Sequence, residues 1–168
     1  MYIRIPARQH LAVRSSFFKM IAVWIFGLML GTLFAAGTDS LFLSWMLRFS
    51  SHPVSIVFSL ILAVLPFLIA AYAVLIKRQE IVLAVLFCKA FVYAFLGFSA
   101  QMIYDTAGWL LQPMIQFPDL LLMPMLFWFC LRGNKALMRD HLTCLCTAIP
   151  VVLIHYFVVL PFVAQLID

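Results

Sequence analysis

Few side chains in this sequence could do chemistry, and most of them stand apart from one another. Lys89 lies within a long apolar stretch, and Asp105 and Asp119 border the apolar windows that follow it. Two carboxylates act together in acid–base catalysis only when they lie close enough to share a proton. Both aspartates are expected at the water interface, and no carboxylate is expected at the depth of Lys89. We therefore predict no catalysis by this pair.

A second group of candidates consists of soft metal ligands in the last third of the chain. The group is made up of Cys130, His141, Cys144 and Cys146. Thiolates and imidazoles are the usual ligands of zinc. Cys144 and Cys146 are two residues apart, however, which directs them to different sides of a helix, and free cysteine is a common apolar filler. With no enzyme motif elsewhere, we predict no metal, no cofactor and no enzymatic activity.

The composition shows which kind of chain must position these residues. Of 168 residues, 67% are apolar and only 10% are charged, whereas a soluble domain carries about a quarter charged residues. The net charge of +5 lies mostly in loops and one short tail, so a nucleic-acid partner is not expected. The sequence predicts an all-α, polytopic membrane protein, with residues 1–168 as a single membrane domain in the lipid bilayer.

The apolar windows predict about five transmembrane helices, since a span takes roughly 20 residues. They cover about 20–37, 54–76, 81–104, 110–131 and 142–164. An N-terminus on the cytoplasmic side and a C-terminus outside place nine of the eleven basic residues inside, as the positive-inside rule requires. A re-entrant hairpin over residues 106–131 is the alternative, but it would put Arg132, Lys135 and Arg139 outside.

Residues 1–19 form a basic cytoplasmic tail, which is either solvated or laid on the anionic inner leaflet. The first apolar run ends in Phe34-Ala35-Ala36-Gly37, which could serve as a signal-peptide cleavage site. The tail is long for a signal peptide, so we expect a retained first helix.

A short amphipathic helix is predicted over residues 39–52, along the outer membrane interface. Thr38, Asp39 and Ser40 are good N-cap residues, and Pro53 follows the segment. One helical face carries the apolar residues Leu41, Phe42, Trp45, Met46 and Phe49.

Small residues recur at helical spacing in two of the predicted spans. Membrane helices depend on such residues for close contact, because lipid provides no hydrophobic force between them. One face contains Gly27, Gly31 and Ala35, and the other contains Ala90, Ala94 and Gly97. The two faces either pack against each other or bind a partner protein, and the sequence favours the first.

Lys89 and a group of prolines are the exceptions within the apolar spans. Lys89 lies nine residues after Glu80, which is about 13 Å along a helix and close to the midplane. The predicted fourth span contains Pro113, Pro118 and Pro124 beside Asp119, so we expect it to be kinked. Lys89 is either a structural anchor or part of an ion relay, and the kinks are either structural or part of a transport site.

Parts of the chain resemble the stage II sporulation protein M family of membrane proteins. Residues 86–95 are similar to that family's apolar segment with a lysine and two small residues, and Gly108-Trp109 and residues 118–124 are similar to later motifs. The first helix also has small residues, at Gly27 and Gly31. Ala90 and Ala94 stand where the family usually has glycine, and Met123 replaces an acidic residue.

The resemblance implies a five-span protein of the bacterial cytoplasmic membrane without catalytic residues of its own. Family members take part in forespore engulfment during sporulation, where they anchor peptidoglycan hydrolases outside the membrane. We therefore expect a non-catalytic membrane scaffold whose partners are such hydrolases. The alternative is a small permease or the membrane subunit of a transporter, which Lys89 and the proline-rich span would suit.

Overall fold

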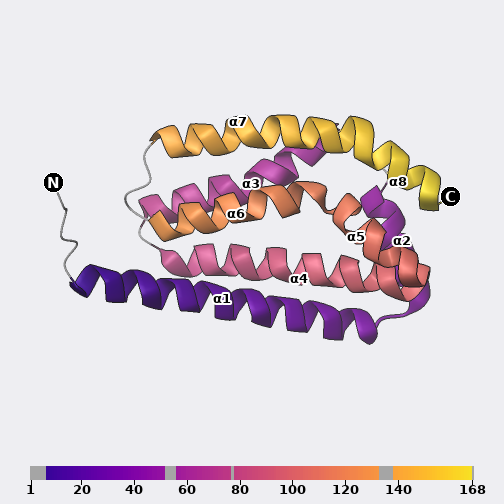
Figure 1. Cartoon of the computed structure of the whole chain (residues 1–168), viewed down its shortest axis with the longest axis horizontal. Helices are drawn as coiled ribbons and strands as arrows, with labels where there is room; N and C mark the ends of the chain where they lie inside the picture. The colour runs from indigo at the N-terminus through magenta and orange to yellow at the C-terminus, as the bar shows by residue number, and fades with distance from the viewer. Residues whose placement is uncertain (1–6, 52–55, 77, 133–137, 168) are drawn as a thin grey trace.

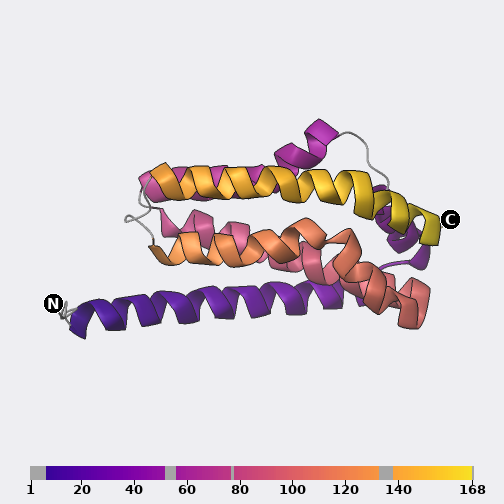
Figure 2. The ribbon, with the colours of Figure 1, turned by 45° about the horizontal axis from the view of Figure 1, so that its top comes forward.

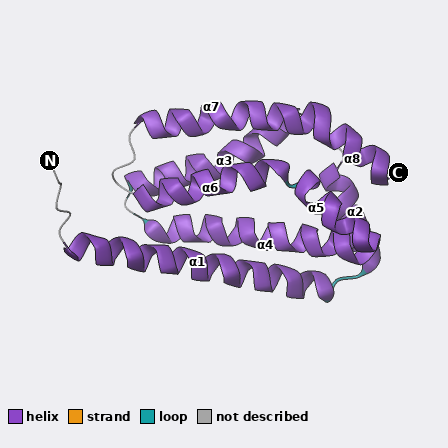
Figure 3. Cartoon of the chain, viewed as in Figure 1, coloured by secondary structure: helices purple, strands orange, loops and turns teal. Residues whose placement is uncertain are grey.

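The computed structural model describes residues 7–51, 56–76, 78–132 and 138–167 of the chain. Every regular element in these ranges is helical and none is a strand (Figure 3). The prediction of an all-α chain is therefore confirmed for the part of the sequence that the structure describes.

Helices follow one another with short connections. In chain order they are α1 (Ala7–Ala36), α2 (Ser40–Ser51), α3 (Ile56–Leu75), α4 (Gln79–Tyr104), the 3₁₀ turn η1 (Asp105–Ala107), α5 (Gly108–Ile115), α6 (Phe117–Arg132), α7 (Met138–Ile154), the π-helical turn η3 (His155–Val159) and α8 (Leu160–Ile167).

The long helices lie side by side and run alternately in opposite directions (Figures 1 and 2). At the end where α1 begins, α3 ends and α4 begins, and α6 ends and α7 begins. At the opposite end lie α2, the turn from α4 into α5, and the end of α8. Because α4 packs against α1, α2, α3 and α5, it is the helix around which the others are arranged.

Three helical stretches among the described residues are long and apolar enough to cross a membrane. They are Phe17–Ala36, Glu80–Ile115 and Cys146–Leu166. The second is 36 residues long and includes a reversal of the chain at Asp105, whose φ of 49° lies in the left-handed region. Beyond this residue α5 folds back along α4, where Gly108 packs against the backbone of Ala100.

Two helix boundaries differ from the predicted windows. Helix α1 begins at Ala7, inside the segment expected to be a tail, because no proline or glycine interrupts the sequence between Ala7 and Phe26. The window 110–131 is divided into α5 and α6 at Gln116. This division determines where the polar side chains meet.

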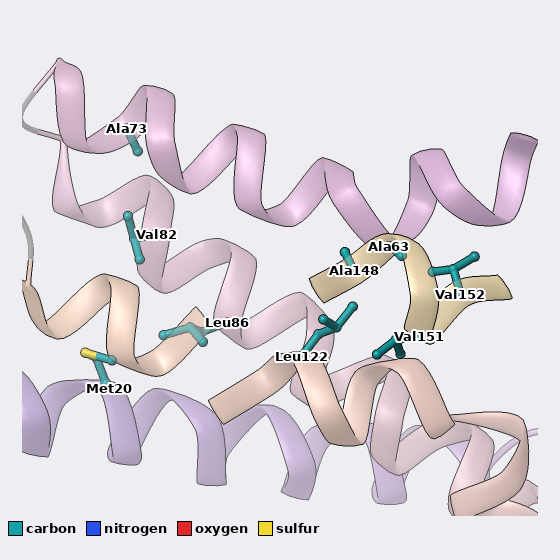
Figure 4. Packing of buried hydrophobic residues seen from close by; sticks show 9 residues of the cluster. All are labelled: Met20, Ala63, Ala73, Val82, Leu86, Leu122, Ala148, Val151 and Val152. Carbon is teal, nitrogen blue, oxygen red and sulfur yellow. The ribbon is translucent and has the colours of Figure 1, made fainter. Parts of the chain in front are cut away.

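Apolar side chains of several helices fill the space between α3, α4, α6 and α7. The central members are Leu86 from α4, Leu122 from α6 and Val152 from α7, each at most 3% exposed (Figure 4). Ala63 and Ala73 of α3 and Ala148 of α7 complete the contact. These residues hold α6 beside α4, and thus bring Asp119 to the middle of α4.

Candidate functional site

Lys89 and Asp119 form an ion pair between α4 and α6. The Lys89 Nζ donates to Asp119 Oδ1 over 2.6 Å, and the two side chains are 23% and 22% exposed. A charge within the bilayer is costly unless it is paired or hydrated. In this contact the two opposite charges compensate each other. The contact also links α4 to the start of α6.

The expectation that no carboxylate lies at the depth of Lys89 was wrong. It placed Asp119 at the water interface, although this residue lies nine residues, about 13 Å along a helix, into the predicted span 110–131. In the structure α5 uses residues 108–115 to return along α4, and α6 starts at Phe117. Counted from the reversal at Asp105, Lys89 lies 16 residues before it and Asp119 lies 14 residues after it, so the two residues reach a similar depth in neighbouring helices.

Pro118 lies in the first turn of α6, directly after the break at Gln116. Proline has no N–H, and in the first turn of a helix this costs no hydrogen bond within that helix. Gln116 ends α5 with φ −105° and ψ 22°. The missing N–H of Pro118 also leaves the carbonyl of Met114, four residues earlier, without its helical donor.

His155 donates to that carbonyl. Its Nε2 lies 3.2 Å from Met114 O, and since a carbonyl only accepts, this nitrogen carries the proton. The His155 ring also stacks on Phe117 of α6, with ring centroids 6.5 Å apart. His155 begins the π-turn, in which Leu160 N–H bonds to the His155 carbonyl. Such bulges occur frequently at functional sites.

The side chain of Gln116 lies between the two broken halves and α4. Its Nε2 donates to the carbonyls of Tyr93 at 3.1 Å and Val92 at 3.4 Å. The residue is only 4% exposed, and its Oε1 has no hydrogen-bond partner among the described residues. We call Lys89, Gln116, Asp119 and His155 the polar centre.

The two predicted small-residue faces pack against each other within this chain. A Cβ on Gly27 would lie 2.8 Å from Ala90 Cβ and from Phe87 O, and a Cβ on Gly31 would meet Phe91 O and Ala94. We call Gly27, Gly31, Ala90 and Ala94 the small-residue seam. Since α4 occupies this face of α1, the seam is not a surface for a partner protein.

Ala35 and Gly97 make other contacts. Ala35 is fully buried against Leu43 of α2 and Phe95 of α4. Gly97 faces the side chain of Gln112 on α5. It therefore allows the returning helix, rather than α1, to approach α4.

Helix α2 forms where the sequence predicts an amphipathic helix, and the residues that it packs on the protein are not the ones predicted to face the membrane interface. Leu43 and Leu47 are fully buried against α4 and its neighbours. The predicted apolar residues Leu41, Phe42, Trp45 and Phe49 are exposed, and Met46 is half-buried. The rings of Phe42, Trp45 and Phe49 stack in a row, with centroids 6.0 and 5.8 Å apart.

The remaining candidate residues contribute less to the site. Pro113 lies within α5 and Pro124 within α6. The side chains of Cys130, His141 and Cys144 lie outside the described residues, and Cys146 is exposed. Among the described side chains, no three of His, Cys, Asp and Glu come together as metal ligands do.

Gln116 and His155 are the two members of the polar centre that the sequence did not identify. Each donates a side-chain hydrogen bond to a backbone carbonyl of another helix. The signal available was Pro118, which frees a carbonyl and so requires a donor, but the sequence does not show which residue supplies it.

No family model, curated protein or solved structure compared with this chain matches it. The resemblance to the stage II sporulation protein M family therefore remains an expectation.

Proposed function

We propose that the chain is a multi-pass protein of the bacterial cytoplasmic membrane with five spans, its N-terminus inside and its C-terminus outside. In this arrangement α5 and α6 together form the proline-kinked fourth span. The five apolar windows, the alternating helix directions (Figure 1), and the basic residues Arg78 at the start of α4 and Arg132 at the end of α6, which lie at the same end of the bundle, support it.

We further propose that it acts as a small permease or as the membrane subunit of a transporter. The supporting observation is the Lys89–Asp119 pair at the start of an interrupted helix. Intramembrane ionisable residues that pair with one another commonly mark substrate or ion pathways. Broken helices near the midplane supply substrate sites in many transporters, because they offer backbone and side-chain groups that a regular helix cannot.

This proposal reverses the order that the sequence favours, and the structure supplies the reasons. The sequence supports a scaffold by the absence of an enzyme motif, the family resemblance, the small-residue face of the first helix and the lack of a visible partner for Lys89. Asp119 is that partner, and α4 covers the glycine face. These two observations remove the last two arguments for the scaffold.

A scaffold that anchors peptidoglycan hydrolases is the second candidate, and one observation favours it. The row of Phe42, Trp45 and Phe49 on α2 points away from the bundle, with exposed fractions of 45%, 59% and 51%. An exposed aromatic row beside a buried leucine face suits an interaction site on a membrane protein. The resemblance described above names the class of partner.

Two sets of variants separate the candidates. The double variant Lys89→Met/Asp119→Leu removes both charges together and should fold, because a paired charge can be replaced by apolar groups of similar size. The variant Trp45→Ser/Phe49→Ser changes only exposed residues of α2. Each would be tested in native cells for hydrolase recovery by affinity purification, and in proteoliposomes for currents evoked by a panel of amines, amino acids and inorganic ions.

For a transporter, the charge-free variant loses the current and the α2 variant keeps it. For a scaffold, the charge-free variant still recovers the hydrolase and the α2 variant does not. A charge-free variant that folds and carries the full wild-type current would refute the transport proposal.

A further inference from the structure

The polar centre contains one buried acceptor to which no described residue donates. The amide orientation of Gln116 is determined by its surroundings, since the opposite orientation would set Oε1 against the carbonyl oxygens of Val92 and Tyr93. Its Oε1 is therefore held inside the bundle without a donor among the described residues. Such a buried oxygen calls for an explanation, and a bound molecule is one.

Asp119 lies one helical turn after Gln116 in the chain and, like Gln116, contacts α4. Gln116 and Asp119 are three residues apart, and both reach α4, one at Val92 and Tyr93 and the other at Lys89. Lys89 and Val92 are also three residues apart, so the two contacts are about one helical turn from each other. The ion pair is partly exposed and the amide is not, so the pair forms the accessible side of the centre.

The carboxylate of Asp119 is paired in this structure with a primary ammonium group, the head of Lys89. A carboxylate that accepts from one –NH₃⁺ group at 2.6 Å has the geometry to accept from another. An ammonium has several N–H donors, so a free ammonium has donors for both Asp119 and Gln116 Oε1, whereas the tethered Lys89 head bonds to Asp119 alone of these two.

We propose that the polar centre binds a small primary ammonium cation, which bonds to the Asp119 carboxylate and to Gln116 Oε1 in exchange for Lys89. This inference rests on the proposed transport function and names its substrate class. The displaced Lys89 head moves towards the exposed side of the pair on its four-carbon stem. Lys89 is thus a built-in competitor for the cation.

The donor set argues for an ammonium rather than an inorganic cation. Hard cations such as magnesium and calcium require about six or more oxygen ligands. Here the carboxylate of Asp119 and Gln116 Oε1 are available, while the nearby carbonyls of Val92 and Tyr93 already accept from the Gln116 amide. Two or three acceptors suffice for the N–H groups of an ammonium.

The test is a binding titration of the full-length protein in lipid nanodiscs. Methylammonium chloride is the probe, tetramethylammonium chloride is a probe of equal charge without N–H groups, and sodium chloride is the inorganic control. The variants are Lys89→Met, Asp119→Asn and Gln116→Met, with Lys19→Met as a matched loss of an exposed lysine on α1. Binding is followed by calorimetry and by the thermal midpoint.

We expect methylammonium to bind the wild type and to bind Lys89→Met at least tenfold more tightly, because the competitor is gone. Gln116→Met should weaken binding about tenfold, Asp119→Asn should abolish it, and Lys19→Met should leave it unchanged. Sodium and tetramethylammonium should not bind. If Lys89→Met does not fold, the Gln116→Met comparison still decides, since it removes no charge.

Equal binding of sodium or tetramethylammonium, unchanged affinity in Gln116→Met, or weaker binding in a folded Lys89→Met would overturn the proposal. Currents in proteoliposomes distinguish its failure from that of the transport function. Binding without any current contradicts transport and leaves the site in place. A current with another solute, together with no methylammonium binding, contradicts the site and leaves transport in place.

Discussion

The small-residue seam and the polar centre hold the same helix, α4, by different means. At the seam, Gly27 and Gly31 let α1 approach until backbone and Cβ atoms touch, and no polar side chain takes part. At the polar centre, α6 is held by an ion pair and a stacked histidine, and Gln116 bonds to two backbone carbonyls of α4. Straight helices can use shape alone in lipid, whereas an interrupted helix exposes polar backbone that other groups must satisfy.

The largest expected effect comes from breaking the ion pair on one side only. Lys89→Met or Asp119→Asn should each lower the free energy of unfolding by about 3 kcal/mol, because one charge or polar group is left unpaired. The double variant Lys89→Met/Asp119→Leu should recover most of this loss. Reversible unfolding in mixed detergent micelles measures all three. A double variant as unstable as the sum of the two single variants would show that the pair is not coupled.

Overpacking the seam should have the next largest effect. Gly31→Leu should cost about 3 kcal/mol at most, because its side chain meets Phe91 O and Ala94 and forces α1 away from α4. Gly37→Leu is the matched control, since a Cβ there has no neighbour closer than 3.7 Å. The same unfolding measurement compares them. Equal stability of the two variants would contradict the packing of α1 on α4.

A smaller effect on the free energy of unfolding is expected from changing His155, which donates to the carbonyl of Met114. His155→Phe should cost about 1 kcal/mol, the usual net value of one hydrogen bond. In a Pro118→Ala background the restored N–H can bond to Met114 O, so the same change should cost less. A double-mutant cycle measures this coupling. A coupling energy of zero would mean that Pro118 and His155 act independently.

Gln116→Met should have the smallest effect on stability, within about 0.5 kcal/mol of the wild type. The carbonyls of Val92 and Tyr93 keep their partners within α4, and the buried oxygen without a donor is removed. The small expected effect on stability distinguishes Gln116 from the other members of the polar centre. A loss above about 2 kcal/mol would instead show that the amide holds α5 and α6 to α4.

The straight helices could be predicted from the sequence, because composition and charge spacing determine where a chain can lie in a bilayer. The helix at Ser40–Ser51 and the contact of Gly27 and Gly31 with α4 follow from local patterns in the same way. The inward packing of Leu43 and Leu47 was not predicted, because the pattern was used only to find the face of α2 that lies at the membrane interface.

The polar centre could not be predicted, because it depends on one turn of the chain. Whether Asp119 meets water or Lys89 is decided by the reversal at Asp105, which sets residues at similar distances before and after it side by side. The prolines signalled an irregular segment but not its direction. Partners 30 residues apart, such as Lys89 and Asp119, are brought together only by tertiary structure.

The most direct test of the central claim is the distance between the Lys89 nitrogen and the Asp119 carboxyl carbon in a lipid bilayer. Solid-state NMR on protein with ¹⁵N-labelled lysine side chains and ¹³C-labelled aspartate carboxyls measures it through dipolar coupling. We predict a strong coupling that disappears in Asp119→Asn and persists in Asp105→Asn. A lysine signal without carboxyl coupling, or one unchanged in Asp119→Asn, would contradict the ion pair and with it the polar centre.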